Sequence, residues 1–480
     1  LPCFDGITAP DWIRRRVAAG LGGICLFARN VGPDATLADL TASLHAERDG
    51  VIIAIDEEAG DVTRIDAATG SRFPGAAALG RVDDVALTAL IARQVGTVLA
   101  DVGVTVNFAP CADVAVDPAN PVIGSRSFGG DVALVARHTA AWVTGQQAAV
   151  AACAKHFPGH GDTVADTHLT LAVLTGTPEE VWEQALPPFR SAIEAGVSAI
   201  MAGHLLVPAV DDLPASVSRR WLAGVLRGEL GFSGAIVSDA LEMAALRDSY
   251  GIPGAAVMAL VAGTDLLCIG GDPMPESALD AIRDAIVTAV RDGVLPAERL
   301  ADAALRAATL GRRPSSPSPH SPDSLGGSAA AGAFDPGPSA SAAERAIQVA
   351  GTVPTLPPPT LVLRCEERPN IAVGAIPWGL LPALPADLRP IEIVLHDGDP
   401  LPATAVQEAG SVIIVTRDRH RHPWMVGLLA AARTLRPDAV LVEMGISGVD
   451  IADAPALASF GAGAANAGAV VRLMVAAPSR

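Results

Sequence analysis

Acids and histidines that could transfer protons or attack an electrophilic carbon directly follow three short apolar runs of this sequence. In chain order they are Asp56-Glu57-Glu58 after Val51–Ile55, Lys155-His156-Phe157-Pro158-Gly159-His160-Gly161-Asp162-Thr163 after Val150–Ala154, and Ser238-Asp239 after Ala235–Val237. A buried strand has no structural use for a terminal carboxylate, whose burial costs several kcal/mol unless it is paired. One such acid could be a helix cap or an exposed rim residue. Three of them at strand ends favour a functional site.

The second string continues to Asp166-Thr167-His168, which suits proton transfer. Residues two apart in an extended chain point the same way, so Asp166 can hydrogen-bond one imidazole nitrogen of His168 and fix its tautomer. Such a dyad serves general acid and base catalysis near neutral pH. Pro158 and Gly159 prevent a helix, so His156 and His160 do not form the zinc pair of a metalloprotease. We predict neither a metal nor a cofactor.

Apolar runs alternate with amphipathic segments from residue 20 to about 310. This alternation predicts parallel strands covered by helices. The expected strands are 23–27, 51–55, 104–108, 150–154, 198–201, 235–237 and 265–269. The expected helices include 83–100, 131–150, 178–195 and 275–292, with Thr177 as a cap and Pro178 in the first turn. We predict a (β/α)8 barrel of TIM type whose clipped first strand ends in the stub Leu1–Gly6, with chemistry at the carboxyl ends of the strands.

The chain changes character after the barrel. Residues 312–342 are rich in Pro, Ser and Ala and predict a linker. Beyond them, the sequence predicts a smaller α/β sandwich over 343–480, with strands at 361–364, 391–395, 412–415, 440–442 and 471–475 and helices at 425–435 and 452–466. The expected domains are therefore a catalytic barrel over 1–311, the linker over 312–342 and the sandwich.

Composition excludes some classes of function. The formal net charge of −18 disfavours binding to nucleic acid or to an anionic membrane surface. No apolar stretch reaches the roughly 18 residues that span a bilayer. The six cysteines are scattered without a CxxC pair, which indicates buried free thiols and a cytoplasmic protein. The chain begins at Leu1 without a methionine, so a leader is not excluded.

The string that begins at Lys155, together with Asn120-Pro-Val-Ile-Gly-Ser-Arg126, closely resembles family 3 glycoside hydrolases, in particular their bacterial β-N-acetylglucosaminidase branch. The resemblance runs along residues 1–310 and implies a barrel that is often followed by an α/β sandwich. It implies that Asp239 is the nucleophile, that His168 is the acid/base and that Asp166 is its partner. Sugar hydroxyls would be held by Asp56, Arg64, Arg126, Lys155 and His156. Lys155 is the only lysine in the chain, and a compact cation beside hydroxyls would explain its retention.

This chain also departs from the family pattern. Many relatives read Gln-Glu-Gly-Gly-Arg-Val after the first aspartate, whereas here the string is Glu57-Glu58-Ala59-Gly60-Asp61-Val62. An acid thus replaces an arginine at Asp61, which puts the selectivity of the site in doubt but not its chemistry. In the second domain, the string Arg417-Asp-Arg-His420-Arg-His422-Pro-Trp424 is either a solvated loop or a cover for the site.

The function implied is that of a retaining exo-β-N-acetylglucosaminidase, which removes terminal non-reducing N-acetylglucosamine from an oligosaccharide or a muropeptide, as in cell wall recycling. In this double displacement, the carboxylate attacks the anomeric carbon while the histidine protonates the leaving oxygen. Histidine carries less negative charge than a carboxylate, so inorganic phosphate could replace water and make the enzyme a phosphorylase. The remaining alternatives are a β-glucosidase or β-xylosidase of the same family, a noncatalytic sugar-binding barrel and a metal-dependent barrel hydrolase.

Overall fold

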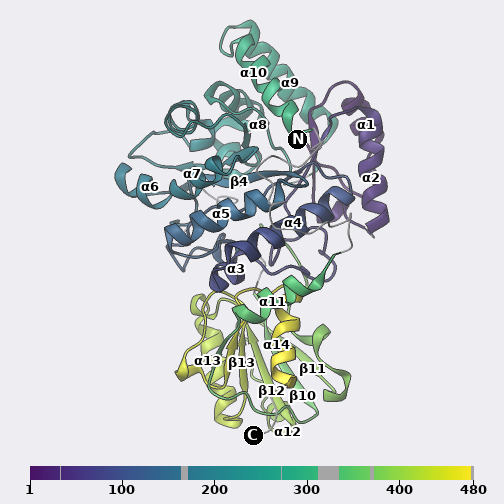
Figure 1. The fold of residues 1–480 in the computed structure, drawn as a ribbon, viewed down its shortest axis with the longest axis vertical. Helices are drawn as coiled ribbons and strands as arrows, with labels where there is room; N and C mark the ends of the chain where they lie inside the picture. Colours follow the sequence, from purple (N-terminus) through teal and green to yellow (C-terminus); the bar gives the residue numbers. More distant parts are fainter. Residues whose placement is uncertain (33, 164–170, 272, 312–333, 368–371, 477–480) are drawn as a thin grey trace. The chain divides into compact units, whose positions relative to one another are not determined.

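The chain folds into two compact units in the computed structural model, which describes residues 1–32, 34–163, 171–271, 273–311, 334–367 and 372–476 (Figure 1). The first unit comprises Leu1–Glu58, Val85–Ile123 and Gly129–Phe334. The second comprises Ala59–Asp84, Gly124–Phe128 and Asp335–Arg480. The second unit thus includes two short segments that precede the linker in sequence. The boundaries at 311 and 342 remain a prediction.

A parallel six-stranded sheet forms the centre of the first unit. Its order is β1 (Gly23–Leu26), β2 (Ile52–Ile55), β3 (Val106–Asn107), β4 (Ala151–Phe157), β6 (Ala199–Ala202) and β8 (Ala235–Ser238). A separate parallel pair joins β5 (Ala172–Val173) to β7 (Leu205–Leu206). Six of the seven predicted strands are confirmed by this sheet.

Two further segments close the sheet on itself. Leu266 forms a parallel bridge with Val237 of β8, and Ile269 forms one with Pro2. The backbone N–H of Ile269 donates to the carbonyl of Leu1 at 3.0 Å. On the other side, the N–H of Cys25 in β1 donates to the carbonyl of Pro2 at 3.0 Å. Leu1 and Pro2 therefore lie between β1 and the segment 265–269, where a barrel strand belongs, and the barrel is confirmed.

Helices cover the outside of this barrel (Figure 1). They are α1 (Asp11–Ala18), α2 (Asp34–Glu47), α4 (Val85–Asp101), α5 (Val132–Gln146), α6 (Pro178–Gln184), α7 (Pro187–Glu194), a π-helix (Arg220–Glu229), α8 (Ala244–Ala262), α9 (Glu276–Arg291) and α10 (Ala297–Leu310). The helix predicted over 178–195 divides into α6 and α7. Its predicted cap is confirmed, because the Thr177 hydroxyl accepts from the N–H of Glu180.

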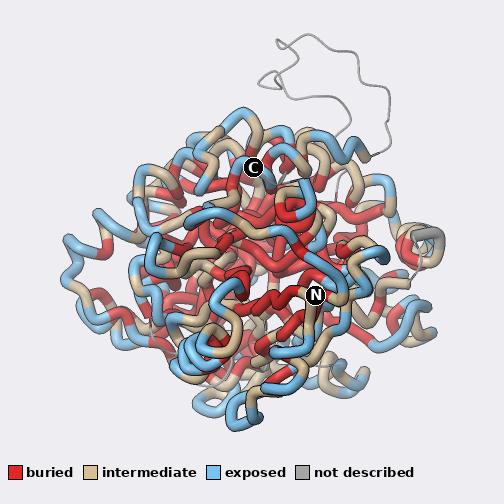
Figure 2. Tube along the Cα trace, turned by 90° about the horizontal axis from the view of Figure 1, so that it is seen from below, coloured by how far each residue is buried: buried red, intermediate tan, exposed pale blue. Residues whose placement is uncertain are grey.

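The barrel interior is filled by small apolar side chains and thiols. Because side chains alternate along a strand, Ala199 and Met201 face the interior core whereas Ile200 and Ala202 pack in the core shared with the outer helices. Three cysteines belong to the interior core, namely Cys25, Cys153 and Cys268. All six cysteines lie among the described residues as buried thiols outside any disulfide, as predicted. Figure 2 colours each residue by its burial and shows buried residues enclosed by exposed ones.

The second unit is built on another six-stranded sheet. Its order is β11 (Ile391–Leu395), β10 (Thr360–Cys365), β12 (Ser411–Thr416), β13 (Val440–Glu443), β14 (Ala456–Ala458) and β9 (Gln348–Ala350), of which β9 alone is antiparallel. Val412 and Ile414 of β12 face one core, and Ile413 and Val415 face the other. This alternation makes the unit an α/β sandwich, which confirms the predicted class.

Helices lie on both faces of this sheet. They are α12 (Ala403–Glu408) and α13 (Pro423–Leu435) on one face and α14 (Ala464–Ala476) on the other. The unit also contains α3 (Ala76–Val82) and α11 (Pro336–Ala346). The strand predicted at 471–475 is wrong, because these residues belong to α14, in which Val470, Val471 and Met474 are buried at helical spacing. The helix predicted over 452–466 is also wrong, since it contains β14. Short apolar runs do not by themselves distinguish a buried helix from a strand.

The last part of the predicted linker is helical. Residues 336–342 begin α11, in which the Asp335 side chain accepts from the N–H of Gly337 and Pro336 occupies the first turn. Small alanines let this helix pack closely, and Ala342, Ala343 and Ala346 are buried. Among the described residues, no helix is both long and apolar enough to cross a membrane.

Candidate active site

The only lysine of the chain lies between two carboxylates at the barrel rim. Lys155, on β4, places its Nζ 2.6 Å from Asp56 Oδ1 and 2.6 Å from Glu58 Oε1. The Lys155 side chain is 3% exposed, and those of Asp56 and Glu58 are 18% and 5% exposed. A buried ammonium needs such partners, because an unpaired one would be strongly destabilising. Of the predicted sugar-binding residues, Asp56 and Lys155 are therefore brought together.

A buried amide network holds the end of β2 in place. Asn107, the last residue of β3, accepts from the N–H of Glu57 and donates to its carbonyl, both at 2.8 Å. Its Nδ2 also donates to Gln146 Oε1 at 3.0 Å, and Trp142 Nε1 donates to the same oxygen at 2.8 Å. Both neighbours of Glu57 are the acids that face Lys155. The network thereby positions that ion pair.

Asp113 organises the loop after β4. Its Oδ2 lies 2.7 Å from His156 Nδ1, while its Oδ1 accepts from the backbone N–H of His156 at 3.2 Å and of His160 at 2.7 Å. Burial of Asp113 by itself acts to raise its pKa, but the charge and hydrogen bond of His156, with His160 nearby, outweigh burial and lower the pKa. A carboxylate that accepts from Nδ1 leaves Nε2 of His156 as the ring atom for a ligand.

Two glycines let the same loop approach its neighbours. Gly159 has a φ of +130°, and a Cβ added to Gly161 would lie 1.7 Å from the carbonyl oxygen of Val114. The peptide bonds Lys155–His156 and Phe157–Pro158 are cis. Side chains larger than hydrogen cannot occupy position 161 without moving the loop that carries His160.

Asp239 directly follows β8, where the sequence placed it. Its backbone N–H donates to the carbonyl of Ala202 at 3.0 Å, and its Oδ1 accepts from the N–H of Ala240 at 2.8 Å. The residue is half-buried. Nearby Glu242 accepts from the N–H groups of Gly270 and Gly271, and its pKa is raised by burial and also by the charge of Asp239. The site thus presents a partly accessible carboxylate on the same rim as Lys155.

The sequence also assigned Arg64, Arg126, Asp166 and His168 to the site. Arg64 and Arg126 belong to the second unit, and both are buried. The Nη2 and Nη1 atoms of Arg64 donate to the carbonyls of Ala372 and Val373 at 2.9 and 3.3 Å. Asp166 and His168 lie outside the described residues, so the acid/base dyad stays a prediction.

One group in the described part of the chain has the composition of a metal site. Ligand atoms of Cys111, Asp113 and His156 lie within 4.8 Å of one another. However, Asp113 Oδ2 is 2.7 Å from His156 Nδ1 and accepts from Cys111 Sγ at 3.1 Å. Two ligands of a tetrahedral zinc ion, each about 2 Å from the metal, would be about 3.3 Å apart. The distances are those of a hydrogen-bonded cluster.

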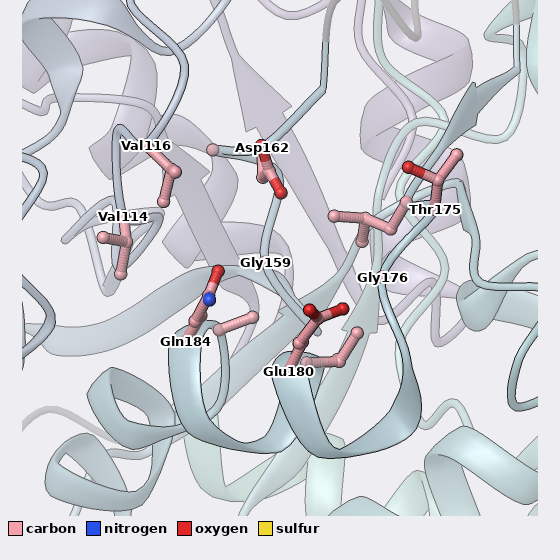
Figure 3. A pocket seen from close by; sticks show the side chains of 12 residues that line it. Val114, Val116, Gly159, Asp162, Thr175, Gly176, Glu180 and Gln184 are labelled. Carbon is pink, nitrogen blue, oxygen red and sulfur yellow. The ribbon is translucent and has the colours of Figure 1, made fainter.

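A cavity of about 270 Å³ borders the same loop. Asp162 lies on one side of it, and Glu180 and Gln184 of α6 lie on the other (Figure 3). The pKa of Asp162 is raised by partial burial and by the charges of Asp117 and Glu180. Neither Asp239 nor Lys155 lines this cavity. We therefore do not assign it to the reacting sugar.

The fold and the rim together define a class of protein. Enzymes built on parallel α/β barrels carry their chemistry at the carboxyl ends of the strands, where this chain gathers Asp239, the Lys155 ion pair and the oriented His156. The chain belongs to glycosyl hydrolase family 3, because the model of that family's N-terminal domain matches residues 11–310. Its substrate is therefore a carbohydrate.

Some known proteins are similar to the barrel in sequence, and a solved structure is similar to the whole chain in fold. A beta-hexosaminidase from Nitrosomonas eutropha is 42% identical over 262 residues, which are 53% of this chain and 74% of that protein. A beta-hexosaminidase from Thiobacillus denitrificans is 39% identical over 270 residues, 54% of this chain and 74% of that protein. The structure of a family 3 beta-N-acetylglucosaminidase from Paenibacillus sp. is 29% identical with a TM-score of 0.84, and the match covers 100% of this chain and 95% of that one.

Sequence reasoning missed three residues that shape the site. Asp113, Glu58 and Glu242 each lie within a few residues of a strand end, yet none was assigned a role. Asp113 follows the apolar run 104–108 by five positions, whereas Asp56 and Asp239 follow their runs by one and two positions. A search for every acid shortly after a barrel strand would have found it. Such a search would not have identified the residue that pairs with each acid.

Proposed function

We propose that this protein is a retaining exo-β-N-acetylglucosaminidase that removes terminal non-reducing N-acetylglucosamine. The observation that carries the proposal is the half-buried Asp239 carboxylate after β8, on the same rim as the Lys155 ion pair, in a barrel of glycosyl hydrolase family 3. The names of the relatives support the choice of sugar.

In this mechanism, Asp239 attacks the anomeric carbon, and the bond from that carbon to the leaving oxygen breaks. A proton from His168, oriented by Asp166, passes to the leaving oxygen. Water then attacks the glycosyl ester and loses a proton to His168, which frees Asp239 with net retention. Sugar hydroxyls would be held by Asp56, Arg64, Arg126, Lys155 and His156.

Labelling with a 5-fluoro derivative of N-acetylglucosamine tests the proposal. Fluorine slows both steps, so the glycosyl ester accumulates, and peptide mapping then locates it. We expect the label on Asp239 and no label in Asp239→Asn. A label on another residue would overturn the assignment.

Analysis of the products of turnover identifies the acceptor. We expect free N-acetylglucosamine as product both with and without inorganic phosphate. Formation of a sugar 1-phosphate at saturating phosphate would make the enzyme a phosphorylase instead. Chromogenic glucosides and xylosides serve as controls for the sugar, since faster turnover of either would replace N-acetylglucosamine as the substrate.

For the natural substrate we propose muropeptide fragments from cell wall recycling, acted on in the cytoplasm. Six buried thiols outside any disulfide support a reducing compartment. Release of N-acetylglucosamine from a purified muropeptide, followed by mass spectrometry, tests the substrate. Fractionation of the producing cells tests the location.

A further inference from the structure

Asp61, the acid that stands where many relatives have arginine, is buried in the second unit. Its side chain is 2% exposed. It lies in the segment 59–84, which belongs to that unit together with residues 124–128 and the C-terminal part of the chain. A carboxylate taken out of water in this way needs donors.

Three donors from three separate segments meet on this carboxylate. Arg417 Nη2 lies 3.0 Å from Asp61 Oδ2, and the Ser125 hydroxyl donates to the same oxygen. The backbone N–H of Ala462 donates to Oδ1 at 2.8 Å. The Arg417 side chain is 22% exposed, and its Cζ atom lies 6.0 Å from the centre of the Trp378 ring. The string that begins at Arg417 is therefore not a plain solvated loop.

The two arginines assigned to sugar binding lie close in sequence to residues that make these contacts. Ser125 directly precedes Arg126, and Asp61 lies three positions before Arg64. The Arg64 guanidinium is itself held by carbonyls of the C-terminal part, those of Ala372 and Val373. The segment that carries Arg64 is thus tied to residues about 300 to 400 positions later in the chain. The segment that carries Arg126 joins them through the bond of Ser125 to Asp61.

Close backbone packing supports the same connection. A Cβ added to Gly70 would lie 3.0 Å from the carbonyl of Pro377, and one added to Gly463 would lie 3.1 Å from the carbonyl of Ser71. The N–H of Ala465 donates to that Ser71 carbonyl at 3.1 Å. Within this tight packing, Asp61 and Arg417 form a charged pair whose loss would leave a buried charge without its partner.

We propose that Asp61 is a positioning residue and that its pair with Arg417 makes the C-terminal part of the chain a determinant of sugar affinity. The pair holds the segments that carry Arg64 and Arg126 at their hydrogen-bonding positions. Arg417 supplies, from a distant segment, a cation that would clash with an arginine at position 61. This inference rests on the proposed sugar-binding roles of Arg64 and Arg126.

A double-mutant cycle on the full chain tests the pair. For 4-nitrophenyl N-acetyl-β-glucosaminide, we expect Asp61→Asn and Arg417→Met each to raise KM at least about tenfold, because small misplacements of binding groups have effects of this size. The catalytic nucleophile is untouched, so kcat should change less than about threefold. The double variant should be no worse than the poorer single variant. Asp61→Arg with Arg417→Asp should recover part of the affinity that Asp61→Arg alone loses.

The exposed ion pair between Arg345 and Asp84 in the same unit, with side chains 48% and 33% exposed, provides the matched control. Arg345→Met and Asp84→Asn should leave KM unchanged. Circular dichroism shows whether each variant folds. If Asp61→Asn does not fold, Arg417→Met and the double variant Asp61→Arg with Arg417→Asp still test the pair.

Unchanged KM in folded Asp61→Asn and Arg417→Met, or strictly additive effects, would overturn the inference. A wild-type enzyme that does not cleave the substrate would instead overturn the proposed function. The two failures are therefore distinguishable.

Discussion

Paired side chains, rather than single residues, define the rim of this barrel. Lys155 forms ion pairs with both Asp56 and Glu58, and the Asp113 carboxylate forms a hydrogen bond with His156 Nδ1. A charge-assisted hydrogen bond is roughly twice as strong as a neutral one, so each pair fixes a side-chain direction. The site is oriented by carboxylates that do not all need to touch the sugar.

Asp113→Asn should impair sugar binding by changing the tautomer of His156. An amide has one acceptor oxygen, which the N–H groups of His156 and His160 already require, and its NH2 would then face Nδ1. We expect kcat/KM to fall about 10- to 100-fold, the equivalent of one hydrogen bond to a charged group. Steady-state kinetics measure it. Wild-type kcat/KM in a folded variant would remove Asp113 from the site.

The lowered pKa of Asp113 also predicts a pH dependence of stability. A carboxylate whose folded-state pKa lies below its ordinary value of 3.8 adds stability above that pH and loses it as the pH falls through the folded-state pKa. The free energy of unfolding of wild type should therefore exceed that of Asp113→Asn by a constant amount at neutral pH. The difference should shrink only below pH 3.8. Urea denaturation at several pH values measures it, and a difference that grows with acidification would contradict it.

At the scale of elements, strands supply the acids and glycines allow the loops to close around them. The run Ala151–Phe157 forms β4 and brings Lys155 and His156 to the rim. The loop after it fits only because the backbone of Gly161 meets that of Val114. Function at this rim depends on backbone packing as much as on charges.

Gly161→Ala should displace this loop. Its Cβ would overlap the carbonyl oxygen of Val114, and overpacking of this kind costs about 1–3 kcal/mol. We expect a lower melting temperature and a higher KM. Gly224→Ala in the π-helix is the control, because the nearest atom found around its Cβ is 4.0 Å away. It should neither lower the melting temperature nor raise KM, since alanine is a better helix former than glycine. Equal behaviour of both variants would show that the loop tolerates the side chain.

At the scale of the whole molecule, the chain has two units with separate hydrophobic cores. The first unit has a core inside the barrel and another between the strands and the outer helices, and the second unit has one on each face of its sheet. Chains with several cores often depart from two-state unfolding. Each unit therefore makes its own contribution to stability.

We expect calorimetry to resolve two unfolding transitions. Leu441→Ala in β13 deletes a fully buried side chain of the second unit and should destabilise that unit by about 2–5 kcal/mol. Only one transition should move. Ile236→Ala in β8, likewise fully buried, should move the other. A single transition shifted equally by both variants would contradict independent cores.

The sequence by itself determined the barrel, the sandwich and the positions of the rim acids. Strand periodicity and the order of apolar runs are local properties, and carboxyl ends of parallel strands meet at one edge. The positions of Asp239 and Lys155 were accessible for this reason. The run 471–475 was misassigned because a short apolar segment is compatible with either a helix or a strand.

Only the tertiary structure decided which charges pair. Asp113 meets His156 across 43 positions, and Asp61 meets Arg417 across 356. No local pattern encodes such partners, because they depend on how distant segments pack. The position of Asp239 directly after a strand was therefore predictable, whereas the partners of the charged residues on the same rim were not.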